Sequence, residues 1–94
     1  MSRASGGRER YSIRFTPRFG RDFDRLSRDV KRRIIEKIED LKGRPHAFKR
    51  LHGRLKGLYA LRIGEYRVIY LIDDEHKEVI LISVAHRKRI YRLR

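Results

Sequence analysis

The 94-residue sequence contains no cysteine, no long apolar run and few acids: 12 Asp and Glu stand against 26 Lys and Arg. The lack of cysteine excludes disulfides and thiolate metal sites. No stretch approaches the ~18 apolar residues that a membrane-spanning helix needs. Residues 1–10 also lack the apolar centre of a signal peptide. We therefore expect a cytoplasmic protein with no membrane partner.

The scarcity of acids leaves a formal charge of +14, and charged residues make up 40% of the sequence, well above the usual ~25%. Such an excess is either solvated or meets a polyanion, which is a nucleic acid, an anionic membrane surface or an acidic protein. Apolar residues make up 39%, which is too many for a disordered chain. A chain of this length forms one domain with one modest core.

The first half of the sequence predicts one strand and two helices. Residues 1–9 are small and polar and predict a disordered tail, so that residues 10–94 make up the domain. Apolar residues alternate over 11–15, as in a strand with one buried face. Helical apolar spacing follows over about 16–28 and 29–43, and the first helix opens with a Thr-Pro pair, a favourable helix start. The short joint predicts an antiparallel helical hairpin.

The second half predicts an antiparallel meander. Residues 44–57 contain proline and glycine and form a long connection. Three β-rich runs follow at 58–63, 66–72 and 78–85, separated by a tight hairpin and by a polar turn. The last two runs are apolar on both faces, so helices must cover at least one side. The predicted fold class is α+β, in the order β-α-α-β-β-β, with a helical hairpin packed on an antiparallel sheet and a short basic C-terminal tail.

Two basic segments flank this sheet and predict a nucleic-acid cleft. The tail over residues 86–94 places Tyr91 among five cations and no acid, and its first residues are fixed by the preceding strand. Arginine supplies planar donors for phosphate, and tyrosine supplies a stacking face. The alternative is a solvated basic tail. The candidate RNA-binding residues of the two segments are Lys49, Arg50, Arg54, Lys56, Lys88 and Arg89.

Two arginines lie within otherwise apolar strands. Arginine seldom occupies a half-buried strand position without a partner. Arg62 and Arg67 therefore either face outward and pair with Glu65 or Glu78, or project from one face of the sheet to hold a phosphate. The second reading is stronger for Arg67, because the residues after it are almost continuously apolar.

The four histidines do not predict a metal site. His46, His52 and His76 lie in connections or turns, where a solvated histidine is usual, and no histidine has the spacing of a metal ligand. His86 differs, because it opens the basic tail at the end of a strand. It is a candidate proton donor near neutral pH or a phosphate contact.

Motifs in the second half of the sequence resemble the C-terminal half of the RelE/ParE toxin superfamily, and the resemblance as a whole covers roughly residues 11 to 92. The matching elements are Leu55-Lys56-Gly57, Gly64-Glu65-Tyr66-Arg67-Val68-Ile69-Tyr70, Asp73-Asp74-Glu75 and His86-Arg87-Lys88-Arg89-Ile90-Tyr91. The resemblance implies a RelE-like mRNA interferase of a type II toxin–antitoxin system. Such an enzyme cuts mRNA in the ribosomal A site without metal or cofactor, by attack of a 2′-hydroxyl on the adjacent phosphate. It also implies silencing by an acidic RelB-like antitoxin.

Carried over by position, the resemblance gives a catalytic set. Arg67 matches an arginine that grips the scissile phosphate, and Arg87 matches one that stabilises developing charge or helps to protonate the leaving oxygen. Tyr91 matches a tyrosine that stacks on or activates the nucleotide. Arg62 and His86 match basic positions of the same set. This site requires the side chains at 67 and 87 to share one side of the sheet.

One departure from the family pattern concerns the catalytic mechanism. Two other functions also stay open. Ala60 stands where a well-studied member has a second strand lysine, and Arg62, Lys56 or His86 would have to compensate for it. The same fold also suits a ParE-type inhibitor of DNA gyrase, which is not an enzyme. The third possibility is an RNA-binding module that catalyses nothing.

Overall fold

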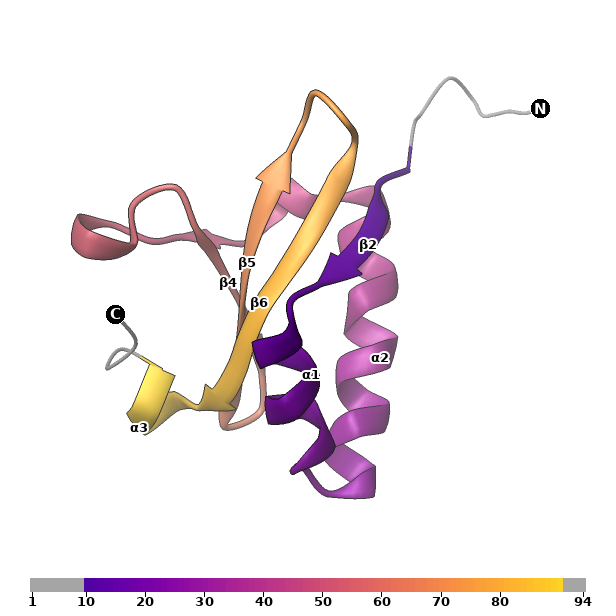
Figure 1. Ribbon diagram of the computed structural model, residues 1–94, viewed down its shortest axis with the longest axis vertical. Coiled ribbons are helices and arrows are strands. Elements are labelled where there is room, and N and C mark those ends of the chain that lie inside the picture. Colours follow the sequence, from indigo (N-terminus) through magenta and orange to yellow (C-terminus); the bar gives the residue numbers. More distant parts are fainter. Residues whose placement is uncertain (1–9, 91–94) are drawn as a thin grey trace.

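The computed structural model describes residues 10–90, with side chains as far as residue 88, and shows the two longest helices on one side of a single sheet (Figure 1). The predicted tail over residues 1–9 and the last residues, 91–94, lie outside the described part. The elements in chain order are β2 (Ser12–Phe15), α1 (Pro17–Asp24), α2 (Arg28–Gly43), η1 (Pro45–Ala47), β3 (Lys49–Arg50), η2 (Gly53–Leu55), β4 (Tyr59–Ile63), β5 (Tyr66–Asp73), β6 (Glu78–His86) and α3 (Arg87–Ile90).

The five strands form one sheet in the order β2-β6-β5-β4-β3. β4, β5 and β6 are the predicted antiparallel meander, and β3 adds an antiparallel edge. β2 pairs with β6 in parallel, so the sheet is mixed rather than wholly antiparallel. A parallel neighbour requires a crossover, and the helical pair provides it. The α+β class is confirmed.

Side chains of the linking residues start both long helices. Thr16 is the N-cap of α1: its Oγ1 accepts the backbone N–H of Phe19 at 3.1 Å and donates to the carbonyl of Ile82 in β6 at 2.8 Å. Ser27 caps α2 and accepts the N–H of Val30 at 3.3 Å. Each cap satisfies a helix donor that would otherwise lack a partner. The cap at Thr16 also fixes the start of α1 against the sheet.

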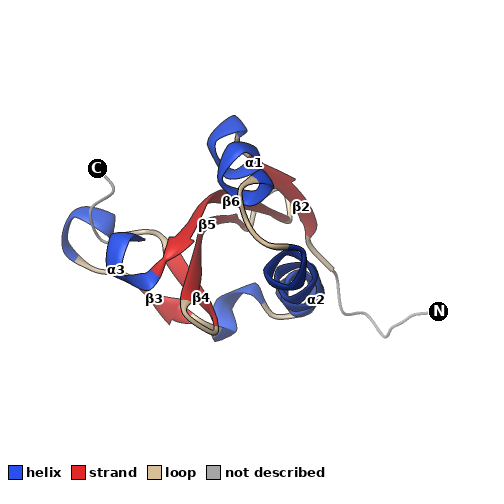
Figure 2. Ribbon diagram, turned by 90° about the horizontal axis from the view of Figure 1, so that it is seen from below, coloured by secondary structure: helices blue, strands red, loops and turns tan. Residues whose placement is uncertain are grey.

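The core lies between the helices and one face of the sheet. Its fully buried members include Ile34 and Leu41 from α2, and Val68, Tyr70 and Leu81 from β5 and β6. Seen from below, α1 and α2 lie on one side of the strands, whereas β3 and α3 lie toward the other (Figure 2). The sheet therefore has a helix-covered face and an outer face that lies away from α2.

The outer face carries a smaller apolar cluster that holds down the connection. Leu51 is buried there against Ala60 and Ile69, and Leu55 packs against them. This contact fixes residues 44–57, which form two short 3-10 helices around β3 rather than an irregular loop. Within residues 10–90, no helix has the length and apolar character needed to cross a membrane.

Candidate nucleic-acid interface

Arg62 and Arg67 lie directly opposite each other across β4 and β5, on the outer face. Their Cα atoms are register partners, and Arg67 is also the partner of Ala85 in β6, which packs with the outer cluster. Side chains of directly paired residues lie on the same face of a sheet. Two arginines in one row repel each other, so the arrangement favours an anion between them.

Both arginines line a cavity of about 440 Å³ at the edge of β4, which the outer face shares with residues of α2 and of the connection. Lys49 from β3 and Lys37 from α2 line the same cavity, with Phe48 and Ala60 among its apolar walls. Lys49 is the register partner of Ala60, so its side chain lies on the outer face. We call Lys37, Lys49, Arg62 and Arg67 the cation pocket. Its four cations come from four different elements.

The cation pocket contains charge of one sign. None of the residues that line it, all of them in the described part of the chain, is acidic. The sequence between Asp40 and Glu65 contains no acid at all. Arg62 is exposed and its Nε donates to the carbonyl of Gly64 at 3.3 Å, while Arg67 is half-buried. Phosphate oxygens are the natural complement of such a pocket.

Further cations surround the pocket on the connection. Arg50, Arg54 and Lys56 are exposed, and none forms an ion pair with another described residue. Lys49 and Arg50 also line a neighbouring cavity of about 230 Å³, together with Leu51, His52 and Leu55. Of the candidate RNA-binding residues of the connection, Lys49 and Arg50 thus line cavities, whereas Arg54 and Lys56 are exposed but line neither of them.

Arg87 lies at the tip of the β4–β5 hairpin, held by Glu65. Its backbone N–H donates to the Glu65 carbonyl at 2.7 Å, and its Nε lies 3.0 Å from the Glu65 carboxylate. α3, which begins at Arg87, lies on the side of the sheet away from α2 (Figures 1 and 2). Arg87 thus belongs to the same end and side of the sheet as Arg67, but it does not line the cation pocket.

His86 lies apart from these arginines. It is the register partner of Tyr66, its ring contacts the Tyr66 ring edge-on at 5.7 Å, and it lines a cavity with Asp22 and Arg25 of the α1 segment. Its Nδ1 accepts the backbone N–H of Lys88 at 3.3 Å, which steadies the first turn of α3.

The remaining tail candidates are only partly described. The side chain of Lys88 is exposed at the start of α3. Tyr91 and the side chain of Arg89 lie outside what the structure describes. No group of three or more His, Asp or Glu side chains able to hold a metal gathers among the described residues.

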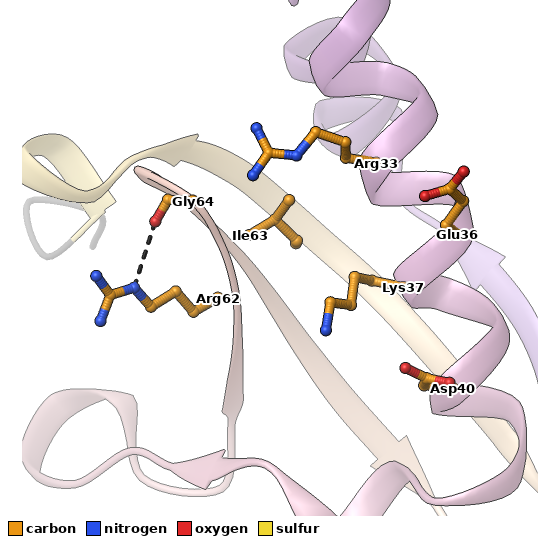
Figure 3. A pocket seen from close by; sticks show the side chains of 7 residues that line it. All are labelled: Arg33, Glu36, Lys37, Asp40, Arg62, Ile63 and Gly64. Atoms are coloured by element: carbon orange, nitrogen blue, oxygen red, sulfur yellow. Dashed lines mark hydrogen bonds between the residues drawn. The ribbon is translucent and has the colours of Figure 1, made fainter.

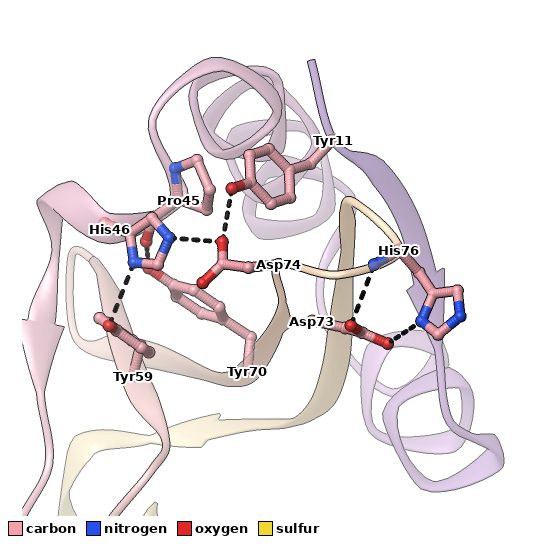
Figure 4. Close-up of polar contacts among 8 residues, drawn as sticks. All are labelled: Tyr11, Pro45, His46, Tyr59, Tyr70, Asp73, Asp74 and His76. Carbon is pink, nitrogen blue, oxygen red and sulfur yellow. Dashed lines mark hydrogen bonds and ion pairs between the residues drawn. The ribbon is translucent and has the colours of Figure 1, made fainter. Parts of the chain in front are cut away.

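A polar network at the opposite end of the sheet anchors the connection (Figure 4). The buried Tyr70 hydroxyl donates to the Pro45 carbonyl at 2.7 Å. His46 contacts the Tyr59 hydroxyl at 3.3 Å and the Asp74 carboxylate at 2.8 Å, and the Tyr11 hydroxyl donates to the same carboxylate at 2.5 Å. These contacts hold η1, and with it β3 and Lys49, against the strands.

Three residues of this network have shifted pKa values. The hydrogen bond from Tyr11, and after it the one from His46, lowers the pKa of Asp74 below its usual value. The same carboxylate raises the pKa of Tyr11, because it favours the protonated phenol. Burial raises the pKa of Tyr70 strongly, so this hydroxyl stays protonated as a donor. The network is therefore structural.

Fold and site together define a basic α+β protein with a cation-lined pocket at the edge of its sheet. The family model for the ParE toxin of type II toxin–antitoxin systems, parDE, matches residues 13–91. The chain belongs to this family of toxins, and the resemblance to the RelE/ParE superfamily is confirmed.

Two curated relatives support the assignment. The chain is 38% identical over 84 residues to toxin RelG of Mycobacterium tuberculosis, a match that covers 87% of this chain and 97% of that one. It is 36% identical over 85 residues to toxin RelE of the same organism, covering 88% of each chain.

Solved structures share the fold. The toxin–antitoxin complex RelBE2 of Mycobacterium tuberculosis matches with a TM-score of 0.78 at 36% identity, covering 84% of this chain and 93% of that one. The archaeal RelE–RelB complex of Pyrococcus horikoshii matches with a TM-score of 0.70 at 26% identity, covering 84% and 97%.

Proposed function

We propose that this toxin is a ribosome-dependent endoribonuclease of the RelE type, which cuts mRNA at a phosphodiester held in the cation pocket. The observation that carries the proposal is the convergence of Lys49, Arg62 and Arg67, with Lys37, on one cavity whose lining, throughout the described residues, includes no acid. The named relatives RelE and RelG support the enzyme rather than the gyrase inhibitor. Action on mRNA would place the protein in the cytoplasm.

The proposed reaction is an internal phosphoryl transfer. The ribose 2′-hydroxyl loses its proton to a base, and its oxygen forms a bond to the adjacent phosphorus. The bond from phosphorus to the 5′-oxygen breaks, and that oxygen takes up a proton. The products are a 2′,3′-cyclic phosphate and a free 5′-hydroxyl. Negative charge accumulates on the equatorial phosphate oxygens during this step, and preformed cations stabilise it most where water is displaced.

The residues divide this work by position. Arg67 is half-buried at the centre of the row and is proposed to bind the scissile phosphate. Arg87 would break its exposed ion pair with Glu65, which costs little energy, and would then bind the leaving oxygen. Tyr91, by resemblance, would stack on the nucleotide or transfer the proton. Lys49 is the register partner of Ala60 and lines the same cavity, so it is proposed to compensate for the strand lysine that is absent there.

A cleavage assay tests the proposal. In a translation extract with purified chain, primer extension should show discrete cuts in ribosome-bound mRNA and almost none in the same RNA without ribosomes. An Arg87→Ala variant should lose the cuts. Because the matched family is named for ParE, DNA supercoiling by gyrase is measured in parallel. Gyrase inhibition without mRNA cuts would replace the proposal with the ParE function, and RNA binding without either would leave a binding module.

We also propose that an acidic RelB-like antitoxin silences this chain and docks on an apolar groove behind the sheet. The groove has a volume of about 520 Å³ and runs between α1, α2 and β2. Phe15 and Ile35 line it and are 64% and 54% exposed. Its walls suit the apolar face of an amphipathic helix, and a charge of +14 favours an acidic partner. From this groove, the rest of the antitoxin would cover Arg67 and Arg87 or displace the C-terminal segment.

Ile35→Glu tests the docking surface. A charge in the groove should weaken binding of the co-expressed antitoxin by at least about tenfold, while the free variant still cuts mRNA. Arg28→Glu, which also places a new carboxylate on α2 but outside the groove, is the control. Equal antitoxin affinity in Ile35→Glu and wild type would place the antitoxin elsewhere. A complex in which Arg67 and Arg87 stay open and in place would contradict the proposed mode of silencing.

A further inference from the structure

A second cavity adjoins the cation pocket around the edge of the sheet. It has a volume of about 490 Å³ and lies between α2 and the end of β4 (Figure 3). Its lining residues are Arg33, Glu36, Lys37, Asp40, Arg62, Ile63 and Gly64. Lys37 and Arg62 line both cavities. The two hollows therefore meet at these two side chains.

The edge of β4 is open where the cavities meet. β3 pairs only with Tyr59 and Ala60, so the rest of β4, from Leu61 to Ile63, has no strand on that side among the described residues. A chain that lies in the cation pocket can therefore continue over this edge toward α2.

Lys37 has no competing partner at this edge. It is exposed, and it forms no ion pair or hydrogen bond with any other described residue. Among the described residues, Arg62 is held only by the 3.3 Å contact from its Nε to the Gly64 carbonyl, which leaves its terminal nitrogens to face an anion. Arg33 reaches toward the same turn, since a Cβ on Gly64 would lie 3.0 Å from its guanidinium (Figure 3).

The two acids of the second cavity limit where an anion can lie. Glu36 and Asp40 both belong to α2 and line only the second cavity. An anion is repelled near them and attracted where the cavities join, because Lys37 and Arg62 meet there with no acid on the pocket side. The favoured position is a single phosphate at the β4 edge.

We propose that Lys37 and Arg62 form a further phosphate-binding subsite at the open edge of β4, which binds an RNA phosphate flanking the one held by Arg67. The subsite rests on the proposed function and extends it, because it gives the RNA a direction across the sheet. The RNA backbone enters or leaves the pocket over β4 toward α2. Lys37 is thus an RNA-binding residue, although it stands on a helix whose other side packs the core.

The salt dependence of RNA binding tests the subsite. The probe is a short fluorescent single-stranded RNA, and the affinity of the full chain is measured over a range of salt concentrations. Lys37→Ala should weaken binding about three- to tenfold at low salt and reduce the log–log salt slope by about 0.7, the value for one lost phosphate contact on a single strand. Lys37→Arg should restore the slope. Glu36→Gln should leave the slope unchanged and modestly strengthen binding.

Arg28→Ala is the matched control. It removes one charge from the same helix, and Arg28 is exposed, lines neither cavity and pairs with no described residue. Its slope should equal that of wild type. If Lys37→Ala behaves as Arg28→Ala does, while Arg67→Ala still weakens binding, the subsite is refuted and the proposed function survives. If Arg67→Ala also binds RNA with the wild-type slope, the proposed function fails as well.

Discussion

The helix-covered side of the molecule and the cation pocket treat charge in opposite ways. On the helix-covered side, cations of α1 and α2 pair with nearby acids: Arg18 lies 3.9 Å from Asp22, Lys42 lies 3.0 Å from Glu39, and Arg32 lies 2.7 Å from Asp29. On the outer side, the cation pocket is lined by four cations and by no acid among the described residues. The charge of +14 is therefore concentrated rather than spread evenly.

This difference shows how a net charge becomes a site. Exposed ion pairs on the helix-covered side contribute about 0–1 kcal/mol each. Within each pair, the acid also offsets the charge of the cation. The lining of the cation pocket includes no acid among the described residues, so no lining charge offsets the electrostatic field of its cations. The low-dielectric walls of a cavity focus such a field. The same residue types thus serve solubility on one face and, as proposed, RNA binding on the other.

The largest expected effect is the loss of cleavage on removal of a pocket cation. Arg67→Ala should reduce mRNA cleavage at least about 100-fold, the usual cost of one transition-state donor, while the free energy of unfolding changes little. Lys42→Ala removes a cation of α2 that pairs with Glu39, and this variant should cut mRNA at a rate within about twofold of wild type. The two rates, compared in one extract, check the contrast. Similar losses in both would mean that total charge alone matters.

A moderate effect is expected where the helix side supports the outer face. Tyr70→Phe removes the hydroxyl that bonds the Pro45 carbonyl and should lower the free energy of unfolding by about 1–2 kcal/mol. Urea denaturation measures this loss. Because η1 carries β3, RNA affinity should also fall. An unchanged unfolding midpoint would show that the connection is held by Leu51 and its apolar neighbours alone.

A smaller effect is expected in acid. The pKa of Asp74 is lowered in the folded protein, so its contribution to stability is present above the unfolded value near 3.8 and is lost as the pH falls through the lowered pKa. Asp74→Asn should therefore reduce the drop in unfolding free energy between neutral pH and about pH 3. Glu75→Gln, in the same turn, should leave that drop as in wild type. An equal drop in all three proteins would contradict the assigned hydrogen bonds.

The smallest effect is expected for a paired surface cation. Arg32→Ala breaks the contact with Asp29 and should change the free energy of unfolding by less than about 0.5 kcal/mol. The change is measured by denaturant titration at low and high salt. A loss of more than 1 kcal/mol would show that helix-side ion pairs carry more energy than the comparison allows.

Local signals in the sequence predicted most of the fold. The three strand runs match β4, β5 and β6 to within a residue or so, because alternation and turn residues act over a few positions. The Thr16-Pro17 start of α1 is also confirmed. The first helix ends at Asp24, earlier than the expected boundary near residue 28, because Ser27 caps α2.

Non-local features escaped prediction. The parallel pairing of β2 with β6 joins residues more than sixty positions apart, and the two-residue β3 is too short to show alternation. Lys37 was missed because helical spacing marks it only as solvent-facing, while its place at the β4 edge depends on how α2 packs. The candidates Arg62 and Arg67 rested on unusual arginines within strands, and their shared cavity could be seen only in three dimensions.

The central claim is that the outer face, and not the charge of the whole molecule, binds RNA. Its most direct test compares two double variants of equal net charge, Lys49→Ala with Arg62→Ala and Lys42→Ala with Arg32→Ala, for binding to one single-stranded RNA over a salt series. We predict that the outer-face pair loses about 1.4 from the log–log slope, as for two phosphate contacts, and that the helix-side pair keeps the wild-type slope. Equal slopes in the two double variants would contradict the account.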